Sequence, residues 1–413
     1  MAPTEGSASM EQEAPLAGIR VLDMTTVMLG PYATQMLGDY GCDVIKIEAP
    51  EGDSTRRTGP AMEPGMAATF IGANRSKRSI VLDLKQAAAR EALLVLVDQV
   101  DVLITSVRPQ KMDALGLSTD MLRQRNPKLI VVGVHGFGSG GPYAGRPAYD
   151  DIIQGLSGLA SLSEIGGGEP SYLPSVVADK TCGLFAVQAV LTALVARGRH
   201  GRGCQVEVPM LESMVNFTLV EHFYGAHFQP PLSTPGYRRL TTPWRRPYPT
   251  LDGHVCIVPY TDQHWQRFFK EAGRPNLMQD ERFSTMSART AHIDTLYQEL
   301  AQCVAGQTTA YWIEACGRLD IPAAPLRRLV DLEDDEHLKQ TGFFISLRDP
   351  AMGLIRMPNA PLKFDGASPS PTLPPRLGQH TLEVLRGAGL PEDTLAAMLE
   401  TRAAVQYNEG DKP

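Results

Sequence analysis

Asp179 is a single carboxylate in the run of small and apolar residues from Val176 to Leu194, close to the expected start of a helix. Removing a lone acid from water is costly, so such a side chain needs either a partner or a chemical role. Capping the helix is the commonest use of an aspartate at a helix start. The residues around Asp179 leave both interpretations open, a helix cap and a reactive carboxylate.

The segment after Asp179 has the apolar spacing of a helix. Leu184, Val187, Leu191, Leu194 and Val195 recur at three- and four-residue intervals, which predicts an apolar face that packs inward. Asp179 and Lys180 then lie at the N-terminal end of this helix. A basic, glycine-rich connector from 197 to 203 and a strand from 205 to 208 follow it.

The first third of the chain alternates apolar, β-branched runs with amphipathic helices, which is typical of an α/β fold with a parallel sheet covered on both faces. Such sheets place ligands beyond the carboxyl ends of their strands. The expected strands are Ile19 to Met24, Val44 to Ile47, Ile80 to Leu84, Val102 to Ile104 and Leu129 to Val134, with helices from Tyr32 to Tyr40 and Ala87 to Val97.

The turn after the first expected strand, Thr25 to Pro31, contains no G-x-G-x-x-G motif, which argues against a nicotinamide enzyme. Pro31 suits a first helical turn, and Gly30 allows a ligand close to the backbone. The helix start is therefore suited to a pyrophosphate, and an ordinary strand-to-helix turn explains the same residues equally well.

Composition places the chain among ordinary globular proteins, because 43% of its 413 residues are hydrophobic and 21% are charged. A net charge of -7 argues against a nucleic-acid partner. The six cysteines are scattered without a C-x-x-C pair or a histidine cluster, so we expect reduced thiols, no metal site and a cytoplasmic location. Residues 1–15 lack the features of a signal peptide and are expected to be a disordered tail. We also expect no membrane-spanning segment.

Several further motifs, in their order along the chain, carry a resemblance to a known family. They are Leu16 to Asp23, Gly30 to Ala33, Gly41 to Glu48, Asn74 to Ser79, Gly136 to Gly138, Pro147 to Asp150 and Leu377 to Thr381. Together they resemble the class III CoA-transferases, a group that includes formyl-CoA, carnitine and succinyl-CoA transferases and is related to the 2-methylacyl-CoA racemases. The resemblance spans about Leu16 to about Leu390.

The resemblance implies that Asp179 is the covalent nucleophile of a CoA-transferase. It would move coenzyme A from an acyl-CoA donor to a small carboxylic acid through an aspartyl-CoA intermediate, with CoA as substrate and no permanently bound cofactor. The implied architecture is a Rossmann-like large domain plus a smaller α+β domain. The chain of this family closes into a ring, and two rings interlock in a homodimer.

The resemblance also implies which residues contact CoA. They are Thr26, Val27, Leu29, Arg75, Leu82, Lys85, Ser106, Val107, Arg108 and His135. Arg108 is the leading candidate for a phosphate contact, since cations are needed there. The chain departs from the family pattern where many members have Glu-Asn-Phe-Arg-Pro, because it has Thr105 to Pro109, and it carries Ala49 and Ala114 where basic residues are common.

Prolines between His222 and Arg246 interrupt any regular pattern and predict a domain boundary. We expect a large CoA-binding domain over residues 16–222, a linker at 223–252, a small domain at 253–324 and a return of residues 325–413 to the large domain. The small domain should contain a strand from His254 to Val258. Its helices are expected near 263–272, 288–305 and 309–319.

Two other functions remain open from the sequence. A 2-methylacyl-CoA racemase needs two acid/base groups, and the racemases carry a histidine where this chain has Tyr149, whose pKa is too high for a ready base. A non-catalytic acyl-CoA-binding protein is the other alternative.

Two further clusters have a functional and a plain interpretation. The glycines from Gly136 to Gly141 are either oxyanion-binding amides or a flexible loop. Arg245 and Arg246 either clamp a dicarboxylate or belong to an exposed linker.

Overall fold

The structure is a computed structural model that describes residues 13–407. These residues form two compact units. The first comprises residues 13–153, Val176–Met214 and residues 340–407, and the second comprises Gln154–Ser175 and Val215–Lys339. Of the expected N-terminal tail, residues 1–12 lie outside the described residues; Ala14 already takes part in a turn, because its carbonyl accepts the Ala17 N–H at 2.9 Å.

The first unit contains the strands β1 Arg20–Met24, β2 Asp43–Glu48, β3 Arg78–Leu82, β4 Val102–Thr105, β5 Ile130–His135, β6 Gln205–Pro209, β10 Phe344–Asp349, β11 Gly353–Pro358 and β12 Ala404–Val405. Its helices are α1 Leu29–Asp39, α2 Ala68–Ala73, α3 Ala87–Val97, α4 Pro109–Ala114, α5 Thr119–Arg125, α8 Val177–His200, α16 Thr381–Gly387 and α17 Glu392–Glu400. Each strand expected from the sequence is present, with ends that differ by up to two residues.

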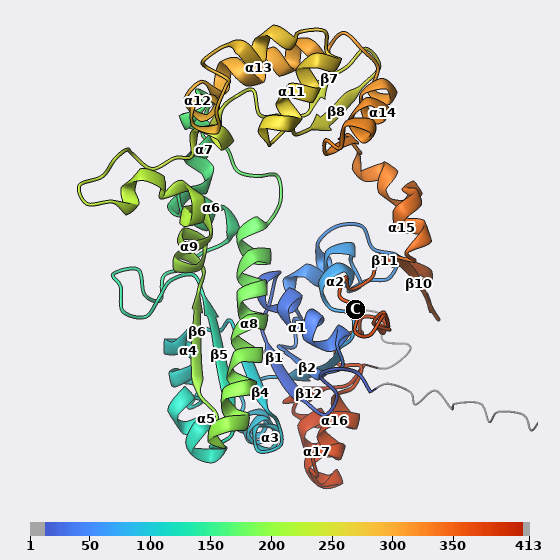
Figure 1. The fold of residues 1–413 in the computed structure, drawn as a ribbon. Helices are drawn as coiled ribbons and strands as arrows, with labels where there is room; N and C mark the ends of the chain where they lie inside the picture. The colour runs from blue at the N-terminus through green and yellow to red at the C-terminus, as the bar shows by residue number, and fades with distance from the viewer. Residues whose placement is uncertain (1–12, 408–413) are drawn as a thin grey trace, which may run out of the picture. The chain divides into compact units, whose positions relative to one another are not determined.

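Seven strands of the described residues form one sheet in the order β12-β3-β2-β1-β4-β5-β6 (Figure 1). All neighbours pair in parallel except β12, which runs antiparallel to β3. The strand order reverses beside β1, because β2 continues to one side of it and β4 to the other. In open α/β sheets a ligand crevice forms at such a reversal, outside the carboxyl ends of the strands.

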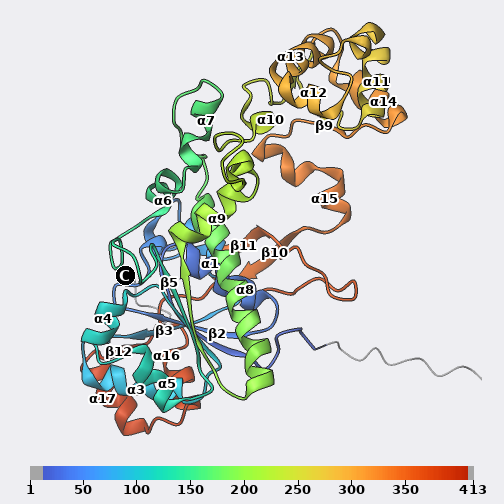
Figure 2. The ribbon, with the colours of Figure 1, turned by 60° about the vertical axis from the view of Figure 1, so that its left-hand side comes forward.

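Helices cover both faces of the sheet. On one face, α3, α5, α16 and α17 share a buried apolar core with side chains of β1 to β5. The other face is covered by α1 and α8, which pack on each other and on the sheet. Figure 2 shows α3, α5, α16 and α17 grouped on one side of the strands and α8 on the other. The C-terminal segment therefore completes the core of the N-terminal one.

The orientation predicted for α8 is wrong. Its buried face consists of small residues, among them Ala178, Cys182, Ala186 and Ala193, whereas Leu184 and Val195 are 55% and 58% exposed. Gly183 shows why small residues form the buried face, because a Cβ at this position would lie only 3.1 Å from the Leu29 carbonyl oxygen. Close packing on α1 needs small residues, so the larger apolar side chains point the other way.

By length and composition alone, α8 is also apolar enough to cross a membrane, contrary to the sequence expectation. A helix that covers the sheet of a globular unit has the same length and composition. One side of α8 packs on α1, β5 and β6.

The second unit contains a three-stranded antiparallel sheet with an aromatic core. Trp265, Phe268, Phe269 and Trp312 are at most 3% exposed and pack against one another. The elements are α7 Leu162–Ile165, α10 Arg238–Thr241, β7 Tyr248–Pro249, β8 His254–Ile257, α11 Asp262–Glu271, α12 Met286–Ala291, α13 Ile293–Val304, α14 Thr309–Leu319 and β9 Ala323–Pro325.

Three helices contain residues of both units: α6 Asp150–Leu156, α9 Met210–His222 and α15 Glu336–Gln340. Five 3₁₀ turns of the described residues are η1 Ser54–Arg57, η2 Leu159–Ser161, η3 Tyr224–His227, η4 Pro275–Gln279 and η5 Leu329–Asp334.

Candidate active site

Asp179 lies in the first turn of α8, but its side chain does not cap the helix. The N-cap residue is Val176, which offers no side-chain acceptor. The Asp179 N–H instead donates to Oδ1 of Asp150, at the start of α6, over 2.9 Å. Within residues 13–407, no hydrogen-bond donor reaches the Asp179 carboxylate. Asp150 therefore performs the capping role that the sequence left open for Asp179.

Burial changes the acidity of Asp179. The residue is 9% exposed, and loss of hydration raises the pKa of its carboxyl group to about 7, with the negative charge of Asp150 adding to the effect. A carboxylate that is poorly hydrated is a better nucleophile than one in bulk water, because less solvent must leave it before it attacks. A raised pKa in a cavity is also typical of functional carboxylates.

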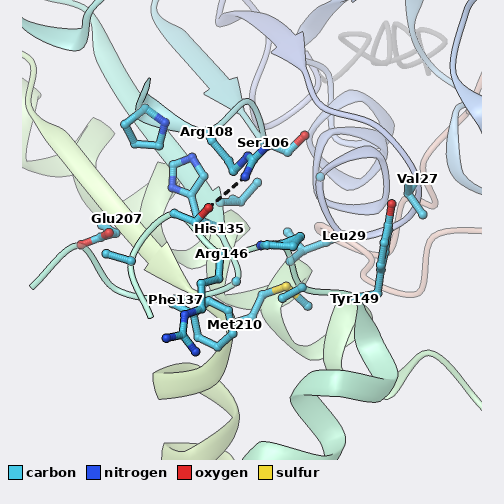
Figure 3. A pocket seen from close by; sticks show the side chains of 18 of the residues that line it. Val27, Leu29, Ser106, Arg108, His135, Phe137, Arg146, Tyr149, Glu207 and Met210 are labelled. Atoms are coloured by element: carbon cyan, nitrogen blue, oxygen red, sulfur yellow. Dashed lines mark hydrogen bonds between the residues drawn. The ribbon is translucent and has the colours of Figure 1, made fainter. Parts of the chain in front are cut away.

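Asp179 is one of the residues that line a cavity of about 490 Å³, which Figure 3 shows from close by. It lies at the carboxyl ends of β1, β4 and β5, where the strand order predicts a ligand. Three cations, Arg108, Lys111 and Arg146, line it together with Tyr149. Apolar side chains complete the wall: Val27, Met28, Leu29, Val134, Phe137 and Met210. We call this space the aspartate cavity.

A second cavity of about 450 Å³ lies next to it, and Thr26 and Lys111 line both. Its wall is formed by the ends of β1, β2 and β3 and by the segment after β4. Most of the lining is apolar: Met24, Ile47, Ala49, Leu82, Leu84, Val107, Ala114 and Leu115. We call this space the apolar cavity. A flat aromatic base would fit its chemistry, and the adjacent cations suit phosphates.

The structure brings nine of the ten residues expected to contact CoA to these two cavities. Thr26, Val27, Leu29, Ser106, Arg108 and His135 line the aspartate cavity. Leu82, Lys85 and Val107 line the apolar cavity. The sheet explains the grouping, because residues that follow different parallel strands meet at one edge.

Arg75 is the exception and lines neither cavity. Its guanidinium is 2.8 Å from the Asp39 carboxylate in a buried ion pair and also donates to the Pro358 carbonyl at 2.5 Å. Arg75 therefore links the end of α1 to the C-terminal segment of the first unit. Its donors are used within the protein, so we remove it from the candidate CoA contacts.

His135 is half-buried at the end of β5. Burial lowers the pKa of its imidazole, and its Nε2 lies 3.2 Å from the Val107 carbonyl oxygen, so this nitrogen is the donor. The ring lies over Gly133, where a Cβ would come within 2.7 Å of ring atom Cε1. Gly133 precedes His135 by two residues, so both lie on the same face of β5, and this glycine is the sequence signal for the packing of the histidine ring on the strand.

The glycine cluster lies at the rim of the aspartate cavity, but two of its amides already have partners. The Gly138 N–H donates to Glu212 at 3.1 Å, and the Ser139 N–H donates to Glu207 at 2.9 Å. These carboxylates occupy the positions that an oxyanion would need. An oxyanion-binding role for these two amides would first require both glutamates to move.

Arg245 and Arg246 belong to the second unit and are exposed. The Arg246 guanidinium stacks 5.1 Å from the centroid of the Trp244 ring. Their expected role as a dicarboxylate clamp stays a prediction.

Sequence reasoning missed Arg146, Glu207 and Met210 in the lining of the aspartate cavity. These residues follow no periodic pattern. The available sequence signal was their position, since Arg146 follows the glycine cluster and Glu207 and Met210 lie in or directly after β6. Among residues 13–407, no three His, Cys, Asp or Glu side chains are grouped to hold a metal ion, and all six cysteines are free thiols.

Comparison with known proteins identifies the family. The sequence pattern of CoA-transferase family III matches residues 16–381. A probable fatty acyl-CoA transferase of Mycobacterium tuberculosis is 32% identical over 385 residues, which cover 89% of this chain and 96% of that protein. A formyl-CoA:oxalate CoA-transferase of Escherichia coli is 29% identical over 416 residues, which cover 94% of this chain and 99% of that enzyme.

Solved structures agree with the sequence relatives. The crystal structure of a variant of the Mycobacterium tuberculosis protein superimposes with a TM-score of 0.77 at 29% identity, covering 89% of this chain and 97% of that one. A CAIB/BAIF family protein from Brucella suis gives a TM-score of 0.76 at 29% identity, covering 91% of this chain and 100% of the other. With a match over nearly its whole length, the chain belongs to CoA-transferase family III and is a CoA-transferase.

Proposed function

We propose that this CoA-transferase moves coenzyme A from an acyl-CoA to a carboxylic acid through a covalent thioester on Asp179. The observation that carries the proposal is the state of Asp179: a buried carboxylate with a raised pKa that lines a cavity at the carboxyl ends of a parallel sheet. Its neighbour Asp150 performs the helix-capping role, so the Asp179 side chain is available for chemistry.

The reaction proceeds in four balanced steps, none of which needs a redox partner. The Asp179 carboxylate attacks the thioester carbonyl carbon, the carbon–sulfur bond breaks, and CoA leaves as a thiolate while a mixed anhydride forms. The thiolate then attacks the Asp179 carbonyl carbon. The donor acid leaves as its carboxylate, and an aspartyl-CoA thioester remains.

The acceptor acid completes the reaction by the reverse route. Its carboxylate attacks the aspartyl thioester, which releases CoA thiolate and forms a second anhydride. The thiolate then attacks the acceptor's carbonyl carbon and regenerates the Asp179 carboxylate. The thioester energy is conserved provided that water is excluded from the intermediates.

The chain's own residues supply position and charge. Asp150 fixes the backbone of Asp179 through the 2.9 Å hydrogen bond. Lys111 lines both cavities and Arg108 lines the aspartate cavity, and both cations are suited to the CoA phosphates. We assign the adenine base to the apolar cavity and the thioester to the aspartate cavity, since CoA is long enough to need both.

The exposed apolar face of α8 supports a homodimer. Leu184, Leu191 and Val195 are between 38% and 58% exposed on one helix, and exposed apolar side chains that share a face are typical of interfaces. We propose the interlocked dimer of ring-shaped chains that the family resemblance implies, in the cytoplasm, where the six free thiols fit a reducing compartment.

The test is intact-protein mass spectrometry of the native protein after incubation with single acyl-CoAs. The relatives suggest formyl-CoA and fatty acyl-CoAs as first donors, and oxalate as a first acceptor. A CoA-sized adduct is expected, and hydroxylamine should convert it to a hydroxamate at Asp179. The variant Asp179→Ala should form neither, whereas Asp151→Ala, which removes the exposed neighbouring acid of Asp150, should behave as the native protein does.

Two results would contradict the proposal. An adduct that persists in Asp179→Ala would place the nucleophile elsewhere. Exchange of an α-proton into deuterated water without any adduct would favour the racemase, which shares the acid at this position by resemblance.

A further inference from the structure

The turn between β1 and α1 forms part of the wall of both cavities, and it contains a strained residue. Val27 has a φ of +71°, in the left-handed region. A β-branched side chain rarely adopts this conformation, because its Cβ substituents crowd the backbone. Such conformations persist only where surrounding structure restrains them, and they concentrate at functional sites.

The restraint on Val27 comes from a buried ion pair. Both carboxylate oxygens of Asp53 lie 3.3 Å from the Val27 amide nitrogen, which donates to them. The Lys46 ammonium lies 3.0 Å from Asp53 and also donates to the Thr25 carbonyl at 2.9 Å. One pair therefore holds the backbone on both sides of Thr26.

A second buried pair holds the ends of the same turn. The Asp23 carboxylate accepts the Thr25 N–H at 3.0 Å and lies 3.1 Å from the Lys77 ammonium. Lys77 also donates to the Pro31 carbonyl at 2.9 Å. The side chains of Asp23, Lys46, Asp53 and Lys77 are all 0% exposed.

Stability of the core does not explain four buried charges here. Replacing a buried ion pair by apolar residues of similar size is often neutral or stabilising. Each pair directs hydrogen bonds to the backbone of one short turn, and its remaining bonds reach Thr55, Thr34 and Asn74. Lys46 lines neither cavity, so it reaches a ligand through the turn or through its partner Asp53, which lines the apolar cavity.

We propose that Lys46 and Asp53 are positioning residues that hold Val27 in its left-handed conformation, so that Thr26 and Leu29 present the surface that binds CoA. This inference rests on the proposed use of the two cavities by CoA. It predicts that the pair affects CoA affinity, and the KM for acyl-CoA, more than kcat. It also predicts that the pair matters less when residue 27 adopts a positive φ without strain.

A double-mutant cycle tests this coupling. The variants are Lys46→Met with Asp53→Asn, which leaves no unpaired buried charge, Val27→Gly, and the combination of all three. The dissociation constant of CoA is measured by calorimetry for each. We expect the Lys46/Asp53 change to weaken CoA binding about tenfold with Val27 and less than about threefold with glycine, which adopts φ of +71° freely.

A control is the cluster of Arg376 with Asp349 and Glu63, which each lie 2.6 Å from the Arg376 guanidinium; none of the three lines either cavity. Arg376→Met with Asp349→Asn and Glu63→Gln, which leaves no unpaired charge in the cluster, should lower thermal stability and leave CoA affinity unchanged. Asp53 lines the apolar cavity, so its substitution also removes any direct contact that it makes with CoA. Glycine at position 27 would not restore such a contact, so a smaller effect in the glycine background indicates the positioning role.

The outcomes separate the inference from the proposed function. If the native protein binds no CoA, the proposed function fails. If the native protein binds CoA and the Lys46/Asp53 change has the same effect with Val27 as with glycine, or none, the positioning role is wrong. Should the double substitution prevent folding, Asp53→Asn alone replaces it in the cycle, with the same expected and contrary results.

Discussion

The carboxylate of Asp150 accepts the backbone N–H of Asp179 at 2.9 Å, so one acid holds the backbone of another. The two residues are far apart along the chain, at the starts of α6 and α8. The contact places the negative charge of Asp150 close to the Asp179 carboxylate, and this charge raises the pKa of Asp179 further. Position and acidity of the proposed nucleophile thus depend on the same neighbour.

Substitutions of Asp150 should separate these two effects. Asp150→Asn keeps an oxygen acceptor for the Asp179 N–H and removes the charge, so we expect the acidic limb of the pH–rate profile to move to lower pH. Asp150→Ala also removes the acceptor, and its kcat should fall by about tenfold or more, in line with a lost helix cap that misplaces the nucleophile. An unshifted acidic limb in Asp150→Asn would show that its charge does not act on Asp179.

Asp179 should make the folded protein less stable at alkaline pH. Its pKa rises from 3.8 to about 7 on folding, so the folded state binds this proton more tightly than the unfolded state. The resulting stabilisation is complete below pH 3.8 and is lost as pH rises through 7. At pH 8 the buried charge costs at most about 4 kcal/mol, from 1.36 kcal/mol per pKa unit.

Urea unfolding at pH 8 and pH 5 tests whether ionised Asp179 lowers the stability of the folded protein. Asp179→Asn should be more stable than the native protein at pH 8, by about 2–4 kcal/mol, and the gain should shrink toward pH 5. The exposed acid Asp151 provides the control, since Asp151→Asn should change stability little at either pH. A gain of the same size at both pH values would mean that ionisation of Asp179 is not the cause.

Arg108 and Arg75 should differ in what they support. Arg108 lines the aspartate cavity, so Arg108→Ala should raise the KM for acyl-CoA by about tenfold or more, as expected for a charged hydrogen bond to phosphate. Arg75→Ala leaves Asp39 buried without its ion-pair partner and should destabilise the fold by about 3–5 kcal/mol. Steady-state kinetics and urea unfolding of both variants distinguish the roles. A specific KM effect from Arg75→Ala in a stable protein would return this residue to the CoA contacts.

The exposed apolar face of α8 should determine the oligomeric state. Leu191→Glu with Val195→Glu places two charges on this face, whose side chains are 38% and 58% exposed in a single chain. We expect the native protein to sediment as a dimer and the variant as a monomer or an aggregate. Exposed Leu362, which lies on the C-terminal segment, serves as the control, since Leu362→Glu should leave the dimer intact. A native protein that sediments as a monomer would contradict the proposed dimer.

Local pattern predicted six of the seven strands of the described sheet, and β12 at Ala404–Val405 was not expected. The helix expected over 87–97 has these bounds in α3, and the strand expected over Val44 to Ile47 is extended by one residue at each end in β2. β-branched runs favour strands through their own side-chain sterics, and helical spacing favours helices, so neither needs distant contacts. Asp179 at a helix start was likewise visible in the sequence, as was the family resemblance.

Tertiary structure decided which residues meet. The larger apolar residues of α8 were expected inside, but close approach to α1 selects the small ones, and spacing alone cannot distinguish two faces that are both apolar. Arg75 was expected at CoA and instead pairs with Asp39. Val27 has a positive φ, and its N–H donates to Asp53, 26 positions later in the chain. Such pairings arise only when strands align, because residues distant in sequence leave no periodic signal of the contact between them.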